Sequence, residues 1–269
     1  MRLAATVQYS GHNFYGFQRQ KEFRTVQGEL EKALSTYLRE EVLLYPAGRT
    51  DTGVSAEGQV IHFDIDGSPE LDELLYAVNA ILPDDVSLSF MKEVAPDFHA
   101  RFSCIGRVYS YTILNSPRRQ ALHQPDSIWI RRPIDEQKLE KLLVECASGE
   151  LDFRAFTKAS LVKRGEPTFR RLEKFKVLRH GDLLFIVIKG SGFLHNMVRI
   201  LVGSAVESLW EKSPEDNFRM MMEKGDRRLA GKTLPANALT FLNAKYKDYK
   251  TPSRFLPTYS LLGMEESEW

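Results

Sequence analysis

The chain has 269 residues, of which 43% are hydrophobic and 11% aromatic, and 37 Lys and Arg residues against 36 Asp and Glu residues leave a formal net charge of +1. About 150 residues per domain predicts one large or two small domains, and this apolar content excludes a disordered chain. No apolar run approaches the roughly 18 residues that span a bilayer, the N-terminus has no signal or transit pattern, and two cysteines make no disulfide framework or zinc motif; we expect a cytoplasmic protein without membrane contact.

Both halves of the chain mix strand and helix patterns, and Thr25 is placed to cap the first helix. Up to residue 90 the predicted elements are strand 3–9, helix 26–38, strands 42–45 and 60–65, helix 69–80 and strand 86–90. From residue 107 they are strand 107–114, helix 135–147, a hairpin of strands 171–178 and 183–189 that turns at His180–Gly181–Asp182, and helix 193–210. This alternation favours an α+β protein and raises the hypothesis of a duplicated unit.

No long linker separates the halves, so the domain boundaries depend on pattern alone. We expect an N-terminal half at residues 1–100, a C-terminal half at 101–250 and a C-terminal tail at 251–269.

The small net charge conceals two basic segments. Residues 101–132 contain six Arg against one Asp, and residues 153–180 contain nine Lys and Arg against two Glu. The remainder of the chain is therefore net acidic. Each segment is either a solvated face or a surface that binds a polyanion such as RNA.

The segment Gly48–Ala56 carries the most chemical information, because Asp51 stands between two glycines and close to Arg49. One interpretation is a polar turn in which Asp51 caps its own backbone. Asp51-Thr52-Gly53 is also the tripeptide of aspartic proteases, but that chemistry needs two carboxylates that share a proton, and the chain has no second Asp-Thr/Ser-Gly.

A third interpretation comes from motifs that occur in a fixed order along the chain. Gly48-Arg49-Thr50-Asp51-x-Gly53-Val54, followed by Gly58-Gln59-Val60, resembles the signature of the tRNA pseudouridine synthase A family. The motifs that agree with it are Tyr9-Ser10-Gly11, Phe14-Tyr15-Gly16-Phe17-Gln18, Thr25-Val26-Gln27-Gly28-Glu29-Leu30, Asn79-Ala80-x-Leu82-Pro83, Phe98-His99-Ala100-Arg101-Phe102-Ser103, Arg107-x-Tyr109-x-Tyr111 and the run from Gly190 to Arg199. The resemblance covers about residues 3 to 246.

This resemblance implies the pseudouridine synthase fold, with two ferredoxin-like or RRM-like halves whose mixed, mainly antiparallel sheets surround a central RNA-binding cleft. It also implies an isomerase that converts uridine to pseudouridine at positions 38, 39 and 40 of the tRNA anticodon stem-loop. The N-terminal half would carry the Asp51 loop and the C-terminal half would complete the site. The family acts as homodimers and needs neither a metal nor an organic cofactor.

The reaction breaks the bond from ribose C1′ to uracil N1 and rejoins the base through C5, so an ionised carboxylate beside the electron-poor sugar centre suits it. Asp51 is the candidate, either as a nucleophile at C1′ or as the base that removes a ribose proton. Arg199 is implied to pair with Asp51. On its predicted helix it shares a stripe with Gly192 and Gly203, which indicates a stripe approached by another backbone.

The resemblance gives Tyr109 the role of stacking on the target uracil, with a part in handling the C5 proton. Arg107 lies on the same face of the predicted strand, and we expect it to bind substrate. Arg49 is expected to help extrude the base or to hold a phosphate, since the target base must leave its stack. Phe14, Tyr15 and Phe17 either line the path of the RNA or belong to the core.

Three residues depart from the family pattern, namely Ser55 where His is frequent, Leu234 where Ala is frequent and Ala238 where Gly is usual. They bear on the details of substrate contact and not on the chemistry. The main rival hypothesis is an RNA-binding protein on an inactive synthase fold. It predicts loss of Asp51, Tyr109 or Arg199, and all three are present; an aspartic hydrolase is a distant third.

Overall fold

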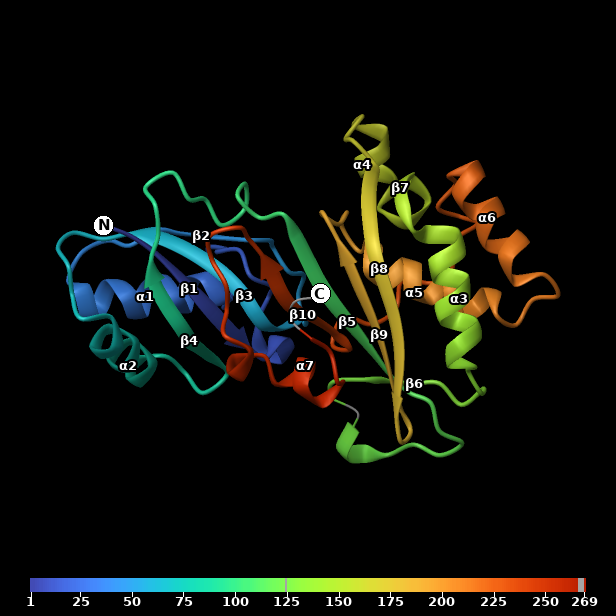
Figure 1. Ribbon diagram of the computed structural model, residues 1–269, viewed down its shortest axis with the longest axis horizontal. Helices are drawn as coiled ribbons and strands as arrows, with labels where there is room; N and C mark the ends of the chain where they lie inside the picture. The colour runs from blue at the N-terminus through green and yellow to red at the C-terminus, as the bar shows by residue number, and fades with distance from the viewer. Residues whose placement is uncertain (124, 266–268) are drawn as a thin grey trace. The chain divides into compact units, whose positions relative to one another are not determined.

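The computed structural model describes residues 1–123, 125–265 and 269 (Figure 1). The chain forms two compact units, one of Met1–Arg107 together with Thr240–Trp269 and one of Val108–Leu239. Helices and strands alternate in both, and the strand pairs are mainly antiparallel, which confirms the α+β class. The units differ from the boundaries expected from sequence, because the last strand and the segment after it return to the first unit. No helix in the described part of the chain is both long and apolar enough to cross a membrane.

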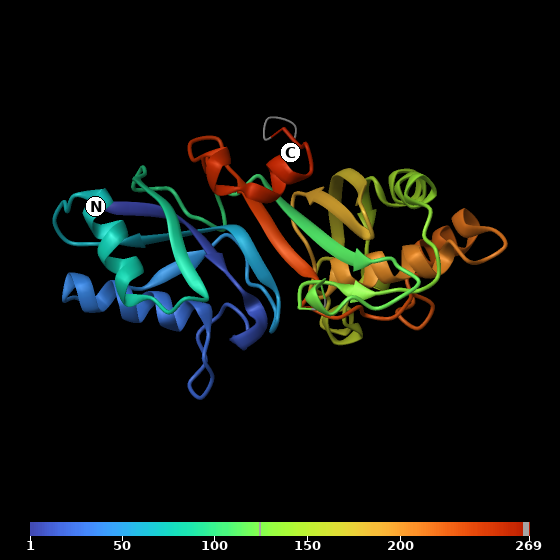
Figure 2. The same ribbon diagram turned by 90° about the horizontal axis from the view of Figure 1, so that it is seen from below.

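The first unit is built on a mixed sheet. Strand β3 pairs antiparallel with β1 and β2 and parallel with β10, while β1 also pairs antiparallel with β4. These strands are β1 (Arg2–Tyr9), β2 (Leu44–Pro46), β3 (Ser55–Asp64), β4 (Val86–Glu93) and β10 (Leu239–Lys245). Helices α1 (Val26–Leu38) and α2 (Leu71–Ile81) lie on one side of this sheet (Figure 2).

Helix α1 begins where the sequence predicts. The Thr25 hydroxyl accepts a hydrogen bond from the Gly28 backbone N–H at 3.3 Å, which satisfies one of the exposed donors of the first turn. Of the apolar residues at the helical period, Val26, Leu30 and Leu34 are fully buried. Burial of that stripe holds the helix against the sheet.

The C-terminal segment lies on the side of the sheet opposite α1 (Figure 2) and includes the short helices η4 (Ser253–Phe255) and α7 (Pro257–Leu261). The buried Thr6 hydroxyl hydrogen-bonds the hydroxyls of Tyr249 and Thr251, each at 2.8 Å. Buried Glu57 on β3 accepts from the Thr258 N–H at 2.9 Å and from its hydroxyl. Polar side chains of β1 and β3 thus find their partners in residues 249–258, so this segment is part of the first unit.

The second unit has a sheet in the order β5-β9-β8-β7, and a short strand β6 pairs parallel with β5. Its strands are β5 (Gly106–Leu114), β6 (Ile128–Trp129), β7 (Gly149–Asp152), β8 (Phe169–His180) and β9 (Leu183–Gly190). Its helices are α3 (Glu136–Ala147), α4 (Ala159–Lys163), α5 (Met197–Ser208) and α6 (Pro214–Lys224). Helix α3 packs on β8, and α5 and α6 contact α3 (Figure 1).

The predicted helix 193–210 begins later than expected. Asn196 has a left-handed backbone with φ +61°, so α5 starts at Met197. Gly192 and His195 therefore precede the helix. The sequence prediction also omitted α6 and β10.

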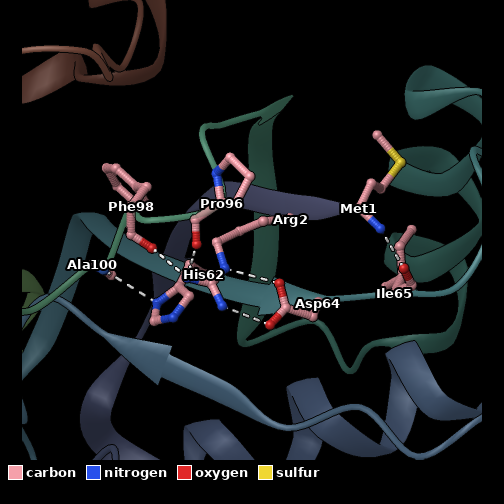
Figure 3. Close-up of polar contacts among 8 residues, drawn as sticks. All are labelled: Met1, Arg2, His62, Asp64, Ile65, Pro96, Phe98 and Ala100. Carbon is pink, nitrogen blue, oxygen red and sulfur yellow. Dashed lines mark hydrogen bonds and ion pairs between the residues drawn. The ribbon is translucent and has the colours of Figure 1, made fainter.

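The loop after β4 is fixed to the first sheet by Arg2 and His62 (Figure 3). The Arg2 guanidinium donates to both carboxylate oxygens of Asp64 at 2.8 and 2.7 Å, and to the carbonyls of Pro96 and Phe98 at 2.6 and 3.0 Å. The Ala100 N–H donates to Nδ1 of His62 at 3.1 Å, so this imidazole acts as an acceptor and must be neutral at that nitrogen.

Burial, followed by the nearby His99 and Arg2, lowers the pKa of His62 to about 4. A histidine in the unfolded chain takes up its proton near pH 6.5. The contribution of neutral His62 to the free energy of unfolding is therefore complete above pH 6.5. It is lost as the pH falls toward 4, by as much as about 3 kcal/mol. Urea unfolding between pH 7 and 4.5 should show this loss, and His62→Asn, which does not titrate, should show a flatter profile. Equal pH profiles for the two proteins would contradict this assignment.

Candidate active site

The Gly48–Ala56 segment forms a tight loop between β2 and β3. Asp51 is half-buried and Arg49 is exposed, while Thr50 between them is only 8% exposed. The Val54 N–H donates to the Asp51 carbonyl at 3.1 Å, and Gly53 has φ +83°, a conformation that favours glycine. The loop therefore turns sharply directly after Asp51.

Residues 9–17 hold the far side of this loop. The Tyr9 hydroxyl hydrogen-bonds the Thr50 hydroxyl at 2.8 Å, and the Phe17 N–H donates to the Thr50 carbonyl at 3.1 Å. Burial raises the pKa of Tyr9 to about 12, so its hydroxyl keeps its proton. Ser55, one of the departures from the family pattern, accepts from the Gly11 N–H at 3.0 Å and thereby supports the loop.

Two glycines allow the backbones to approach so closely. A Cβ at Gly11 would lie 2.4 Å from the Val54 carbonyl carbon. Gly16 has φ +89°, and a Cβ there would lie 2.9 Å from the Thr50 carbonyl oxygen. Neither position has room for a side chain, so the shape of the Asp51 loop is set by direct backbone packing.

The near side of the loop is held by Gln59 and Arg107. The Gln59 amide donates to the Gly48 carbonyl at 2.7 Å. Nε and Nη2 of Arg107 donate to the Ala47 carbonyl at 3.1 and 2.7 Å, and Nη2 also donates to the Arg101 carbonyl at 3.1 Å. Arg107 thus fixes the start of the Asp51 loop through backbone carbonyls.

Tyr109 belongs to the second unit, where β5 leaves it 8% exposed. Its ring meets Phe193 edge-to-face, with centroids 5.0 Å apart and ring planes at 79°. Two residues further on, Tyr111 is fully buried and donates its hydroxyl to the Pro235 carbonyl at 2.8 Å, which identifies it as a core tyrosine.

Arg199 lies on α5 of the second unit and is held by neighbouring groups of that unit. Its Nε donates to the Leu234 carbonyl at 2.6 Å and its Nη1 to Oδ1 of Asn196 at 3.0 Å. A Cβ on Gly203 would lie 2.4 Å from the Lys232 carbonyl oxygen, which confirms that another backbone runs along this stripe. Leu234 contacts Arg199 through its carbonyl, so the departure from Ala leaves that bond unaffected.

The structure thus groups Asp51, Arg49 and Arg107 in the first unit, and Tyr109 and Arg199 in the second. Of the three aromatic residues considered for the path of the RNA, Phe14 and Phe17 belong to the core, at 2% and 0% exposed. Only Tyr15, at 52%, reaches the surface. Within the described residues, no group of three His, Cys, Asp or Glu side chains is arranged to hold a metal ion.

Sequence reasoning did not identify the residues that support the candidate site. Tyr9, Gly11 and Gln59 each stand in one of the family motifs, but only the folded chain shows that they contact residues 48–55.

Ala238, the third departure from the family pattern, is 1% exposed, and its carbonyl accepts a hydrogen bond from the Thr112 N–H at 2.9 Å.

Comparison with known proteins gives a consistent result. A family model described as tRNA pseudouridine synthase matches residues 5–103 and 146–247. The chain is 36% identical over 247 residues to tRNA pseudouridine synthase A of Shigella boydii serotype 4 (strain Sb227), covering 92% of this chain and 90% of that protein. It is 37% identical over 246 residues to tRNA pseudouridine synthase A of Aliivibrio fischeri (strain MJ11), covering 91% of this chain and 93% of that protein.

Among solved structures, one titled "Crystal Structure of a Cbf5-Nop10-Gar1 Complex" aligns with a TM-score of 0.39 and 12% identity, over 97% of this chain and 67% of that chain.

The packing of Gly16 predicts a specific effect on stability. Gly16 and Gly67 both have positive φ, +89° and +77°, but nothing lies within 4 Å of a Cβ at Gly67. Both substitutions to Ala carry backbone strain, and Gly16→Ala adds a clash with Thr50. Urea unfolding should therefore show that Gly16→Ala loses about 1–3 kcal/mol more than Gly67→Ala. Equal losses would show that the 10–17 backbone does not pack on the Asp51 loop.

Proposed function

Since the chain belongs to the tRNA pseudouridine synthase family, we propose that it isomerises uridine to pseudouridine in the anticodon stem-loop of tRNA, at positions 38, 39 and 40. One observation carries the proposal: the loop that matches the family signature presents Asp51 on a backbone fixed from both sides. A rigid carboxylate can stabilise charge that develops on a bound sugar without first reorganising.

The reaction exchanges one bond of the nucleotide for another. The C1′–N1 bond breaks, uracil turns within the site, a C1′–C5 bond forms, the proton on C5 leaves to solvent and N1 takes up a proton in its place. The product is an isomer of the substrate, so the enzyme has to supply charge stabilisation, confinement of the free base and proton transfer.

Asp51 provides the charge. As an ionised carboxylate it either attacks C1′ or removes a ribose proton, and both routes need it beside the sugar. Arg49 is exposed two residues before it. We assign to Arg49 the extrusion of the target base or a contact with its phosphate, because a stacked base cannot reach Asp51.

Tyr109 and Arg199 complete the proposed chemistry. Tyr109 is assigned to stack on the uracil and to take part in moving the C5 proton, and its edge-to-face contact with Phe193 fixes the plane of its ring. Arg199 is assigned to keep Asp51 ionised. Its bonds to Leu234 and Asn196 orient the guanidinium before substrate arrives.

The RNA backbone needs cationic partners, and the structure narrows the basic residues suited to this role. In the 153–180 segment several cations pair with acids, such as Arg164 with Glu166 and Lys176 with Glu140. Lys158 and Lys163 at α4 and Arg171 on β8 are exposed. We assign phosphate contacts to these three residues. We also propose that the enzyme is a cytoplasmic homodimer in which one tRNA contacts both subunits.

Substitution of Asp51 tests the reaction and the residue separately. With tRNA that carries tritium at uridine C5, the wild-type protein should release tritium to water. Asp51→Asn, which keeps the shape of the side chain but removes its charge, should lower the rate more than about a thousand-fold. Asp66→Asn, an exposed aspartate of the same unit, is the matched control and should leave the rate unchanged.

The outcomes distinguish two errors. Absence of release by the wild type from every tRNA would refute the enzyme and favour an inactive RNA-binding protein. Normal release by Asp51→Asn would refute only the role of Asp51.

Arg107→Lys separates positioning of the loop from binding of substrate. Lysine cannot reproduce the two-pronged bond to the Ala47 carbonyl, so loss of positioning should lower kcat about 10–100-fold with KM nearly unchanged. A direct contact with substrate, as expected from sequence, would instead be kept in part by lysine if it is made to a phosphate. Steady-state kinetics with Arg107→Lys and Arg107→Ala should show similar losses in kcat; a change confined to KM would establish the substrate contact.

A further inference from the structure

The loop between β1 and α1 carries a pair of aromatic rings on the surface of the first unit. Tyr15 is 52% exposed and Phe23 is 45% exposed. Their ring centroids lie 4.4 Å apart with the planes at 33°, so each covers part of the other and the outer faces stay open to solvent. Two large apolar rings held together at the surface are the kind of feature that marks a binding site.

The loop holds this ring pair in place without help from a ligand. The Tyr15 N–H donates to the Arg24 carbonyl at 2.9 Å, and the Gln20 amide donates to the Tyr15 carbonyl at 2.8 Å. Arg24 binds both oxygens of Asp85 at 2.7 Å and its guanidinium lies 4.3 Å from the centre of the Phe14 ring. Both ends of the loop are therefore fixed, and a partner would meet a surface that is already organised.

The backbone that follows Tyr15 lies against the Asp51 loop. Gly16, which follows Tyr15 directly, has Thr50 and Thr52 backbone atoms within 3.3 Å of its Cβ position. Phe17, one residue further, donates to the Thr50 carbonyl. When an RNA places its target nucleotide at Asp51, a neighbouring nucleotide would thus be within reach of Tyr15.

Charge at the tip of the loop favours an anionic partner. Arg19 and Lys21 are both exposed, against one exposed acid, Glu22, and the Arg19 side chain is 58% exposed even though it pairs with Glu31 at 3.0 Å. Open ring faces beside exposed cations are the arrangement by which proteins bind unpaired nucleotides, since the rings stack on bases and the cations meet phosphates.

On the basis of the proposed function, we propose that Tyr15 and Phe23 form a stacking site for an unpaired base of the RNA that neighbours the target uridine. The outer face of Tyr15 takes the base, and Arg19 and Lys21 lie along the adjoining phosphates. Stacking accepts any base, so this site would anchor different tRNAs without selecting their sequence.

Binding without turnover tests this site. A fluorescently labelled anticodon stem-loop RNA is titrated with the full-length protein carrying Asp51→Asn, with and without Tyr15→Ala and Phe23→Ala together. The double substitution should weaken binding about 5- to 100-fold. Tyr15→Phe with Phe23→Tyr, which keeps both rings, should bind within about twofold of the parent, as should Tyr76→Ala, a 78% exposed tyrosine on α2 of the same unit.

A second variant distinguishes stacking from simple apolar contact. Tyr15→Leu with Phe23→Leu keeps apolar surface but has no ring faces, and it should bind as weakly as the double alanine variant. The fluorescent base 2-aminopurine is placed in turn at each loop position beside the target. At one position the wild-type rings should quench its fluorescence, and this quenching should be lost in the double alanine and the double leucine variants.

Three results would overturn the proposal: unchanged affinity of the double alanine variant, full affinity of the leucine variant, or unchanged quenching at every position. A shift in sedimentation mass of the double alanine variant with unchanged RNA affinity would assign the pair to a protein interface instead. Tritium release by the wild type is scored separately. Its absence refutes the isomerase, whereas normal release with unchanged RNA affinity refutes only the stacking site.

Discussion

Direct packing of one backbone on another fixes the Asp51 loop, and the other features of the first unit's site depend on it. Gly11 and Gly16 bring residues 10–17 against Thr50–Val54, where no side chain fits between them. This contact places the Thr50 carbonyl in reach of Phe17 and the Thr50 hydroxyl in reach of Tyr9. Hydrogen bonds then complete an arrangement that sterics have already determined, and the backbone that carries Asp51 is fixed.

The second unit supports its candidate residues by the same physical means. Gly203 lets the Lys232–Leu234 backbone approach α5, and the Leu234 carbonyl then accepts a hydrogen bond from the Arg199 guanidinium. In the second unit the Arg199 guanidinium is oriented in part by a main-chain carbonyl, which other residue types can provide equally well. This explains how Leu234 can depart from the family pattern while its bond to Arg199 is kept.

Local patterns in the sequence predicted most elements of the fold. Thr25 caps α1 through a residue only three positions away, and the turn at Gly181 joins the adjacent strands β8 and β9. Features set by distant contacts were not predictable. Thr6 meets Tyr249 across 243 residues, so a polar C-terminal stretch looked like a tail. Asn196 adopts a left-handed backbone that no periodicity reveals, so α5 was expected too early. For the candidate site, the short motif identified Asp51, whereas Tyr9, Gly16 and Phe193 emerged only from tertiary contacts.

The buried bonds between β1 or β3 and residues 249–258 also set an order of events during synthesis of the chain. A ribosome releases the N-terminus first, yet the first unit lacks β10 and its covering segment until the last residues emerge. The second unit is continuous from Val108 to Leu239 and has all its strands earlier. The Asp51 loop is therefore translated early, while the unit that carries it closes last, so a truncated product would expose β1 and β3 without assembling a complete site.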